Sequence, residues 1–212
     1  MEFIRAWRTR QVRSFPAVGR FSGRNQALAG KVPGGLSGGA TSVEVMTSAD
    51  LLSDAFSRIR DAVHRAARDL TLDALAQRVA PDANTIAWLV WHLTRIQDDH
   101  IADAAGRERV WTAEGWVARF GLPYPESATG YGHRAEDVAA VRVESDLLIG
   151  YHDAVHAQTI RFVRTLTDSD LDRIVDTAWN PPVSLGVRLI SVISDDLQHA
   201  GQAAFVRGIV DR

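Results

Sequence analysis

The run SVISDDLQHAGQAAFVRG, residues 191–208, lies within an apolar segment whose spacing predicts a helix over about 185–209. Asp195 and His199 are four residues apart, so a helix places them one turn apart on the same face. Gln202 continues this face, which is otherwise apolar. Burying three polar side chains without partners would cost several kcal/mol. A metal ion bound at this face would give these side chains a common partner.

A second apolar segment, AWLVWHLTRIQDDH, carries another histidine. Asn84 or Thr85 can cap a helix that runs from there to about residue 105. His92 neighbours the buried face of this helix, so two histidines and a carboxylate could form a three-ligand metal site with open positions. Asp99, two turns later, is a candidate partner for His92. The alternative is a core histidine bonded to a backbone carbonyl.

Two further segments have helical spacing of apolar residues. The first covers about 49–70, and the second covers about 136–166 with an interruption at Gly150. His152 and His156 share the four-residue spacing but lie beside the apolar stripe, so we expect them to be half exposed and outside the metal site. Four apolar stripes predict an all-α fold, an antiparallel four-helix bundle with a long connector between its second and third helices.

The connector at 106–134 is rich in glycine, proline and aromatic residues. A segment of this length without regular structure inside a domain is usually functional. Together with 179–183 it is predicted to wall the opening of the site. Packing over the end of the bundle is the alternative role. The candidate wall residues are Trp111, Trp116, Tyr131 and Trp179.

Composition excludes several classes of protein. The chain has 212 residues and no cysteine, so disulfides, thiolate metal sites and cysteine nucleophiles are excluded. A net charge of −2 gives no sign of a nucleic-acid partner, and no apolar run reaches the roughly 20 residues that span a membrane. No Glu-x-x-His motif supports a di-iron bundle, and no phosphate-binding glycine motif is present.

Charge and composition divide the chain into two parts. Residues 1–45 hold six arginines and Lys31 against Glu2 and Glu44, and they are rich in glycine and serine. We expect this basic leader to be disordered, or not to be native sequence, because a helix start follows directly after Met46. Residues 46–212 then form the bundle domain.

The four helices, the histidine in WLVWHL and the terminal D-x-x-x-H-A-G-Q together resemble the DinB-like superfamily. The nearest branch is that of actinobacterial members related to mycothiol-dependent maleylpyruvate isomerase. The resemblance covers about 48–208 and implies a metal triad of His92, Asp195 and His199. Asp195 departs from the pattern, because that branch commonly has the longer glutamate at this position.

The resemblance implies a metal-dependent enzyme that uses mycothiol as cosubstrate, an S-transferase or isomerase acting on small electrophiles in the cytoplasm. It also implies a homodimer. Two imidazoles and a carboxylate suit zinc first, and also nickel, iron or manganese. A metal-dependent hydrolase has the same ligands. A noncatalytic dimeric bundle that binds a metal or a ligand is the third alternative. The sequence assigns no catalytic residue beyond the metal ligands.

Overall fold

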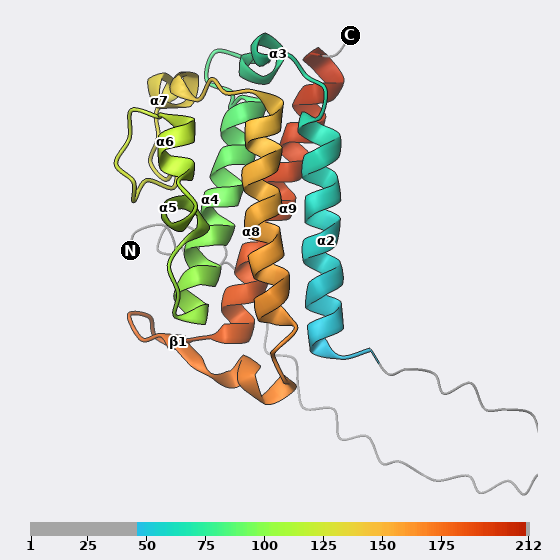
Figure 1. The fold of residues 1–212 in the computed structure, drawn as a ribbon, viewed down its shortest axis with the longest axis vertical. Coiled ribbons are helices and arrows are strands. Elements are labelled where there is room, and N and C mark those ends of the chain that lie inside the picture. Colours follow the sequence, from blue (N-terminus) through green and yellow to red (C-terminus); the bar gives the residue numbers. More distant parts are fainter. Residues whose placement is uncertain (1–45, 211–212) are drawn as a thin grey trace, which may run out of the picture. The chain divides into compact units, whose positions relative to one another are not determined.

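The computed structural model describes residues 46–210 of the chain, and the predicted leader lies outside these residues. Four long helices lie side by side, which confirms the predicted all-α bundle (Figure 1). Helices α2 and α4 each pack against both α8 and α9, so α2 and α4 lie on one diagonal of the bundle. The four helices are α2 (Ser48–Ala67), α4 (Ile86–Ala105), α8 (Ser145–Val163) and α9 (Leu185–Val210).

Helix α2 begins as its sequence predicts. The hydroxyl of Thr47 accepts a hydrogen bond from the backbone N–H of Asp50, and the Asp50 carboxylate accepts one from the N–H of Thr47. These reciprocal bonds satisfy two N–H groups that the first turn leaves open. Phe56, Ile59 and Val63 lie three and four residues apart and are wholly buried. Helix α2 therefore enters the core along one face.

Helix α4 is buried on nearly every side, including its polar residues. His92, Arg95 and Asp98 are all buried. Helices α8 and α9 cover two sides of α4, and α5 (Val110–Ala113) in the connector also packs against it. Burial of polar groups this deep requires hydrogen-bond partners, and the connector supplies several of them.

The connector contains short helices, contrary to the expectation of an irregular segment. The Asp98 carboxylate accepts hydrogen bonds from the backbone N–H groups of Val110 at 2.9 Å and Trp111 at 2.8 Å, which fixes the start of α5. Helix α6 (Trp116–Phe120) follows directly. The rings of Trp111 and Trp116 both pack against Tyr151 of α8, so they belong to the core.

The predicted third helix is wrong in its first part. Residues 136–166 form two helices, α7 (Ala135–Ala140) and α8, separated by an extended segment in which Val141 and Val143 are buried. Burial of these two β-branched side chains favours the extended backbone over a continuous helix. Gly150 does not interrupt α8. A β-carbon there would lie 3.2 Å from the Trp116 ring, so glycine allows that ring to approach.

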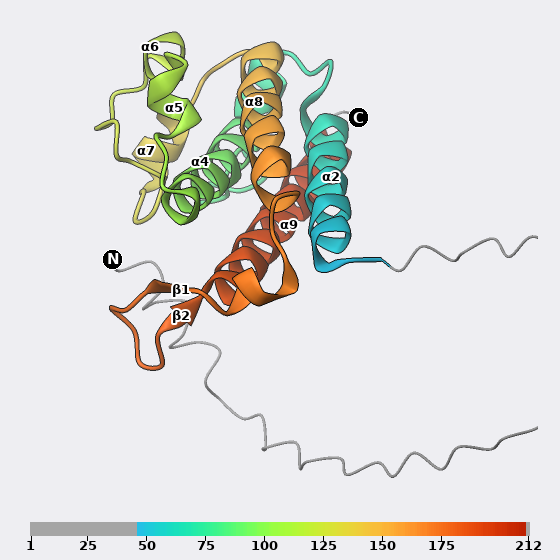
Figure 2. The same ribbon diagram turned by 60° about the horizontal axis from the view of Figure 1, so that its bottom comes forward.

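The remaining elements lie at both ends of the bundle, with β1 at one end and α3 at the other (Figure 1). A 3₁₀ turn, Asp168–Asp172, leads into β1 (Ile174–Asp176), which pairs antiparallel with β2 (Val183–Ser184) just before α9 (Figure 2). The short helix α3 (Leu72–Ala76) joins α2 to α4. Among the helices of residues 46–210, none is long and apolar enough to cross a membrane.

Candidate metal centre

Three side chains from two helices converge between α4 and α9. His92 on α4 and Asp195 and His199 on α9 each offer one donor atom, and these atoms lie within 4.8 Å of one another. The Nε2 atom of His199 is 3.7 Å from a carboxylate oxygen of Asp195. Within residues 46–210, no other group of three or more such residues meets this criterion. The structure therefore brings together the three residues that the resemblance implies.

Hydrogen bonds fix the tautomers of both histidines. Nδ1 of His92 is bonded to the backbone carbonyl of Thr129, and Nδ1 of His199 is 3.0 Å from Oε1 of Gln202. Because a carbonyl oxygen only accepts, each Nδ1 carries the proton and each Nε2 keeps a lone pair. Metal-binding histidines are commonly held in this way. Gln202 was predicted from the sequence, whereas Thr129 was not, since a backbone carbonyl carries no sequence signal.

The electrostatics of the centre suit a divalent cation. Burial, followed by the nearby His199, lowers the pKa of His92 to about 3, so its ring is neutral at pH 7. Burial raises the pKa of Asp195, and His199 opposes that rise. The Oδ2 atom of Asp195 is buried and has no hydrogen-bond partner in the structure. A cation bound between the two imidazoles would satisfy this oxygen, so these residues fit a metal ion.

An indole ring covers the centre on the α4 side. Trp88 stacks on His92 with ring centroids 4.6 Å apart, and it lies nearly perpendicular to the His199 ring, with centroids 6.4 Å apart. The Trp88 Nε1–H donates to Nδ1 of His133 at 3.1 Å, which fixes the indole. Trp88 was not predicted in this role, although its position four residues before His92 places both residues on one face of α4.

The other predicted residues have contacts of their own. Asp99 forms an ion pair with Arg109, and its predicted role as a partner of His92 stays a prediction. Tyr131 is exposed, and the indole N–H of Trp179 donates to Asp176 at 3.1 Å. Trp111 and Trp116 pack in the core, and the aromatic wall at the site opening stays a prediction.

Two buried polar residues depart from the sequence expectations. His152 is wholly buried instead of half exposed, and neither ring nitrogen has a hydrogen-bond partner. Asp196, next to Asp195, is also wholly buried with both carboxylate oxygens unpartnered. Burial, and then the charge of Asp195, raise the pKa of Asp196 well above its usual range, which favours its neutral form. Of these two aspartates, the sequence pattern assigned only Asp195 to the apolar face of α9.

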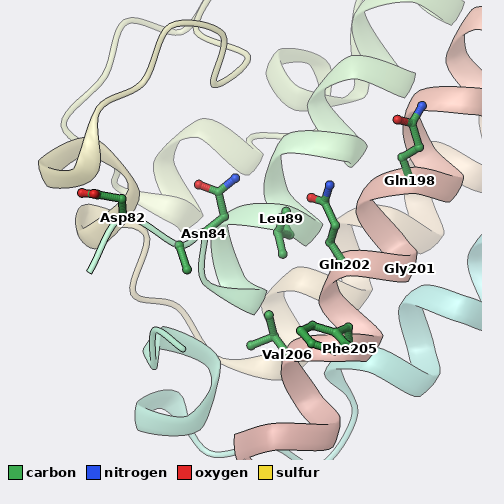
Figure 3. Close-up of a pocket in the computed structure, with 9 residues that line it drawn as sticks. Asp82, Asn84, Leu89, Gln198, Gly201, Gln202, Phe205 and Val206 are labelled. Atoms are coloured by element: carbon green, nitrogen blue, oxygen red, sulfur yellow. The ribbon is translucent and has the colours of Figure 1, made fainter. Parts of the chain in front are cut away.

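A pocket of about 620 Å³ lies beside the metal centre, between α9 and the segment that precedes α4 (Figure 3). Gln202 joins the two, since it lines the pocket and bonds to His199. The polar residues of the lining are one carboxylate and three amides, and the lining holds no lysine or arginine. The lining residues are Asp82, Ala83, Asn84, Leu89, Gln198, Gly201, Gln202, Phe205 and Val206.

Comparisons with known proteins show the family and the fold of this chain. A family model described as Mycothiol-S-transferase matches residues 51–212, which confirms the predicted resemblance. A solved structure from Enterococcus faecalis, described as that of a conserved protein, is similar to this chain at 29% identity. The similarity covers 78% of this chain and 98% of that chain, with a TM-score of 0.73. The search of curated proteins found no match.

Proposed function

The chain belongs to the mycothiol S-transferase family, and from this premise we propose that it transfers a low-molecular-weight thiol to a small electrophile at a metal centre. The observation that carries the proposal is the convergence of His92, Asp195 and His199, with one oxygen of Asp195 buried and unpartnered. The chain has no cysteine, so the thiol must come from a cosubstrate. Mycothiol is the thiol that the family description names.

The protein residues hold the donors of this centre in place. Thr129 and Gln202 keep Nε2 of each histidine free of a proton, and Trp88 covers one side of His92 with an apolar ring. We propose zinc as the ion, with nickel, iron or manganese accepting the same donors. When bound, such an ion lowers the pKa of a thiol or a water molecule.

The neighbouring pocket suits the polar part of the cosubstrate. Asn84, Gln198 and Gln202 supply amide donors and acceptors, and Phe205 offers an apolar surface. This donor set fits a neutral, polyhydroxylated thiol better than a thiol with several carboxylates or phosphates, because no cation lines the pocket. In the transfer, the thiol sulfur forms a bond to the electrophilic carbon, the leaving group departs with its electron pair, and the thiol proton passes to solvent.

The family resemblance also supports two further proposals. We propose that the protein acts in the cytoplasm, where a reduced thiol cosubstrate persists, and that it forms a homodimer. We propose neither a nucleic acid nor a membrane as a partner. The net charge of −2 gives no sign of nucleic-acid binding, and no helix of the described residues is long and apolar enough to cross a membrane.

The test is thiol consumption with a fluorogenic alkyl halide as electrophile. Zinc-loaded protein should accelerate conjugation of mycothiol, and glutathione, which carries two carboxylates, should react more slowly. His199→Ala should lose the acceleration, and His156→Ala is the matched control that should keep it, because His156 lies on α8, away from the cluster. Absence of acceleration with mycothiol would contradict the proposal. Metal-dependent hydrolysis of an ester without any thiol would support the hydrolase alternative.

A further inference from the structure

Two glutamines on α9 present opposite groups to the pocket (Figure 3). Gln198 donates its amide N–H groups to the backbone carbonyl of Ser194 at 3.0 Å and to the Ser194 hydroxyl at 3.2 Å, which leaves its Oε1 as an acceptor. Gln202 has the reverse arrangement, because its Oε1 accepts from Nδ1 of His199 at 3.0 Å and its Nε2–H groups remain as donors. The two residues are one turn apart, so one face of α9 offers the pocket an acceptor and a donor.

This combination suits a hydroxyl group. A hydroxyl both donates and accepts, so one hydroxyl of a ligand can donate to Oε1 of Gln198 and accept from Nε2 of Gln202. A carboxylate oxygen only accepts and would leave Gln198 without a partner, whereas an ammonium group only donates and would leave Gln202 without one. The two amides therefore favour a ligand that carries hydroxyls.

The surface of α9 next to these amides is open to a ligand. Gly201 lines the pocket, and a β-carbon there would meet nothing within 4 Å, so the packing of the chain does not require this glycine. Glycine is unfavourable inside a helix, and close approach of a ligand to the helix backbone accounts for it. Phe205, one turn later, lines the same pocket with a ring that is 68% exposed. A ligand ring can pack on these two residues while its hydroxyls reach the amides.

Gln202 bonds to a proposed metal ligand, whereas the bonds of Gln198 go to Ser194. When a ligand hydroxyl accepts from Nε2–H of Gln202, the amide becomes polarised and its Oε1 becomes a stronger acceptor. The hydrogen bond from Nδ1 of His199 then strengthens. A stronger acceptor at Nδ1 makes Nε2 of the same ring more basic and fixes the orientation of the ring, and both effects favour metal binding.

We propose that Gln202 is a positioning residue that couples the pocket to the metal centre, so that a hydroxylated ligand in the pocket tightens metal binding through His199. This coupling rests on the proposed function, which supplies the zinc ion and the polyhydroxylated thiol. Coupling between two binding sites is reciprocal, so zinc must tighten binding of the pocket ligand by the same factor. We expect a factor of about five, the lower end of typical couplings, because a single hydrogen bond carries it.

The desthio analogue of mycothiol, in which hydrogen replaces the thiol, tests this path, because it keeps the hydroxyls and has no sulfur to bind the metal. Titration calorimetry on the full chain gives its dissociation constant with and without zinc. Competition with a chromophoric chelator gives the zinc dissociation constant with and without the analogue. Both constants should fall about fivefold in wild-type protein. An analogue that does not bind, or that binds equally with and without zinc, would overturn the proposal.

Substitutions of Gln202 separate its two hydrogen bonds. Gln202→Glu keeps an acceptor for His199 and loses the N–H donors. It should therefore hold zinc at least as tightly as wild type, bind the analogue roughly 10-fold more weakly and show no coupling. Gln202→Met removes both groups and should also reduce zinc affinity about 10–100-fold.

Gln198→Met is the matched control, since it removes the other amide of the same pocket wall without touching His199. It should weaken binding of the analogue roughly 10-fold and leave both the zinc affinity and the coupling factor unchanged. Equal losses of zinc affinity in Gln198→Met and Gln202→Met would overturn the role of Gln202.

These binding measurements need no turnover, so their outcome is separate from that of the conjugation assay. Conjugation of mycothiol without coupling would overturn the role of Gln202 and leave the proposed function standing. Coupling without conjugation would support the role of Gln202 and contradict the proposed function.

Discussion

A β-carbon at position 130 would lie 2.7 Å from Nδ1 of His92, so Gly130 packs directly against the ring of a proposed metal ligand. The preceding residue, Thr129, accepts a hydrogen bond from the same nitrogen. Gly130 also has a φ of +96°, a conformation that favours glycine. The end of the connector therefore holds His92 by one hydrogen bond and one close contact.

Gly130→Ala should weaken metal binding without abolishing it. The added methyl group must displace the His92 ring or the Thr129 carbonyl, and either shift turns Nε2 away from the other donors. Loss of a group that orients a ligand typically reduces metal affinity about 10–100-fold. The measurement is the dissociation constant for zinc, by competition with a chromophoric chelator.

Gly132→Ala is the matched control for this change. Gly132 also has a positive φ, +75°, but a β-carbon there would meet nothing within 4 Å. Both variants carry backbone strain, and only Gly130→Ala contacts His92. Equal losses of zinc affinity in the two variants would show that strain in the connector, and not the contact with His92, sets the affinity.

Arg95 connects the connector to the core, and Arg95→Met should destabilise both. Its guanidinium is wholly buried and donates to the carbonyl of Ala128 at 3.1 Å and to that of Glu126 at 3.4 Å. It also lies 3.7 Å from the buried Asp98 carboxylate, which the variant would leave without its countercharge. We expect a loss of about 3–5 kcal/mol in the free energy of unfolding. Zinc binding should also weaken, because Thr129 directly follows Ala128, whose carbonyl would lose its hydrogen bond to Arg95.

Urea unfolding and zinc competition measure these two effects. The control is Arg58→Met on the exposed surface of α2, where Arg58 pairs with Asp54. Exposed pairs of this kind contribute little to stability, so the unfolding midpoint of the control should hardly move. If Arg95→Met unfolded at the same urea concentration as wild type, the connector would be held by other contacts.

The apolar spacing of the sequence predicted the long helices well. Helices α4 and α9 run as expected, because each carries an apolar pattern over about five turns or more and has clear end signals, such as Thr85 and Gly106 for α4. The cluster of His92, Asp195 and His199 followed from the family resemblance together with this spacing. A four-residue interval on one helix already brings two donors together, and the apolar surroundings of His92 indicated the third.

Other features depend on contacts between distant segments, which one sequence does not reveal. The carbonyl of Thr129 and the close approach of Gly130 exist only once the connector packs on α4. The extended segment between α7 and α8 resembles helix in its spacing, and tertiary burial of Val141 overrides that pattern. His152 appeared half exposed because helical spacing locates a face only to within about one residue.

Substitutions of the three proposed metal ligands should change zinc binding in different ways. His199→Ala should abolish stoichiometric zinc binding, because it removes a nitrogen donor, and Asp195→Ala should weaken binding strongly. Asp195→Glu should retain binding, since it restores the longer carboxylate common in the related isomerases. His156→Ala should leave the stoichiometry at one ion per chain. Elemental analysis of untagged protein measures all four variants, and zinc retained in His199→Ala would contradict this assignment.

The last prediction concerns the stability of the protein in acid. His152 is wholly buried, and burial lowers its pKa from 6.5 to about 3. Between these two values the unfolded chain binds a proton at this residue and the folded chain does not. The free energy of unfolding therefore falls as the pH falls through this range, by at most about 1.4 kcal/mol per unit for this one group.

His152→Leu removes this proton uptake and replaces two unpartnered ring nitrogens with an apolar side chain. Relative to wild type, the variant should gain about 2 kcal/mol in the free energy of unfolding between pH 7 and pH 5. His92 and His100, whose pKa values burial also lowers, are present in both proteins and cancel in the difference. Urea unfolding of both proteins at the two pH values gives the comparison. The contrary outcome is a difference in the free energy of unfolding between variant and wild type that does not change from pH 7 to pH 5. It would show that His152 is protonated, or reached by water, in the folded protein.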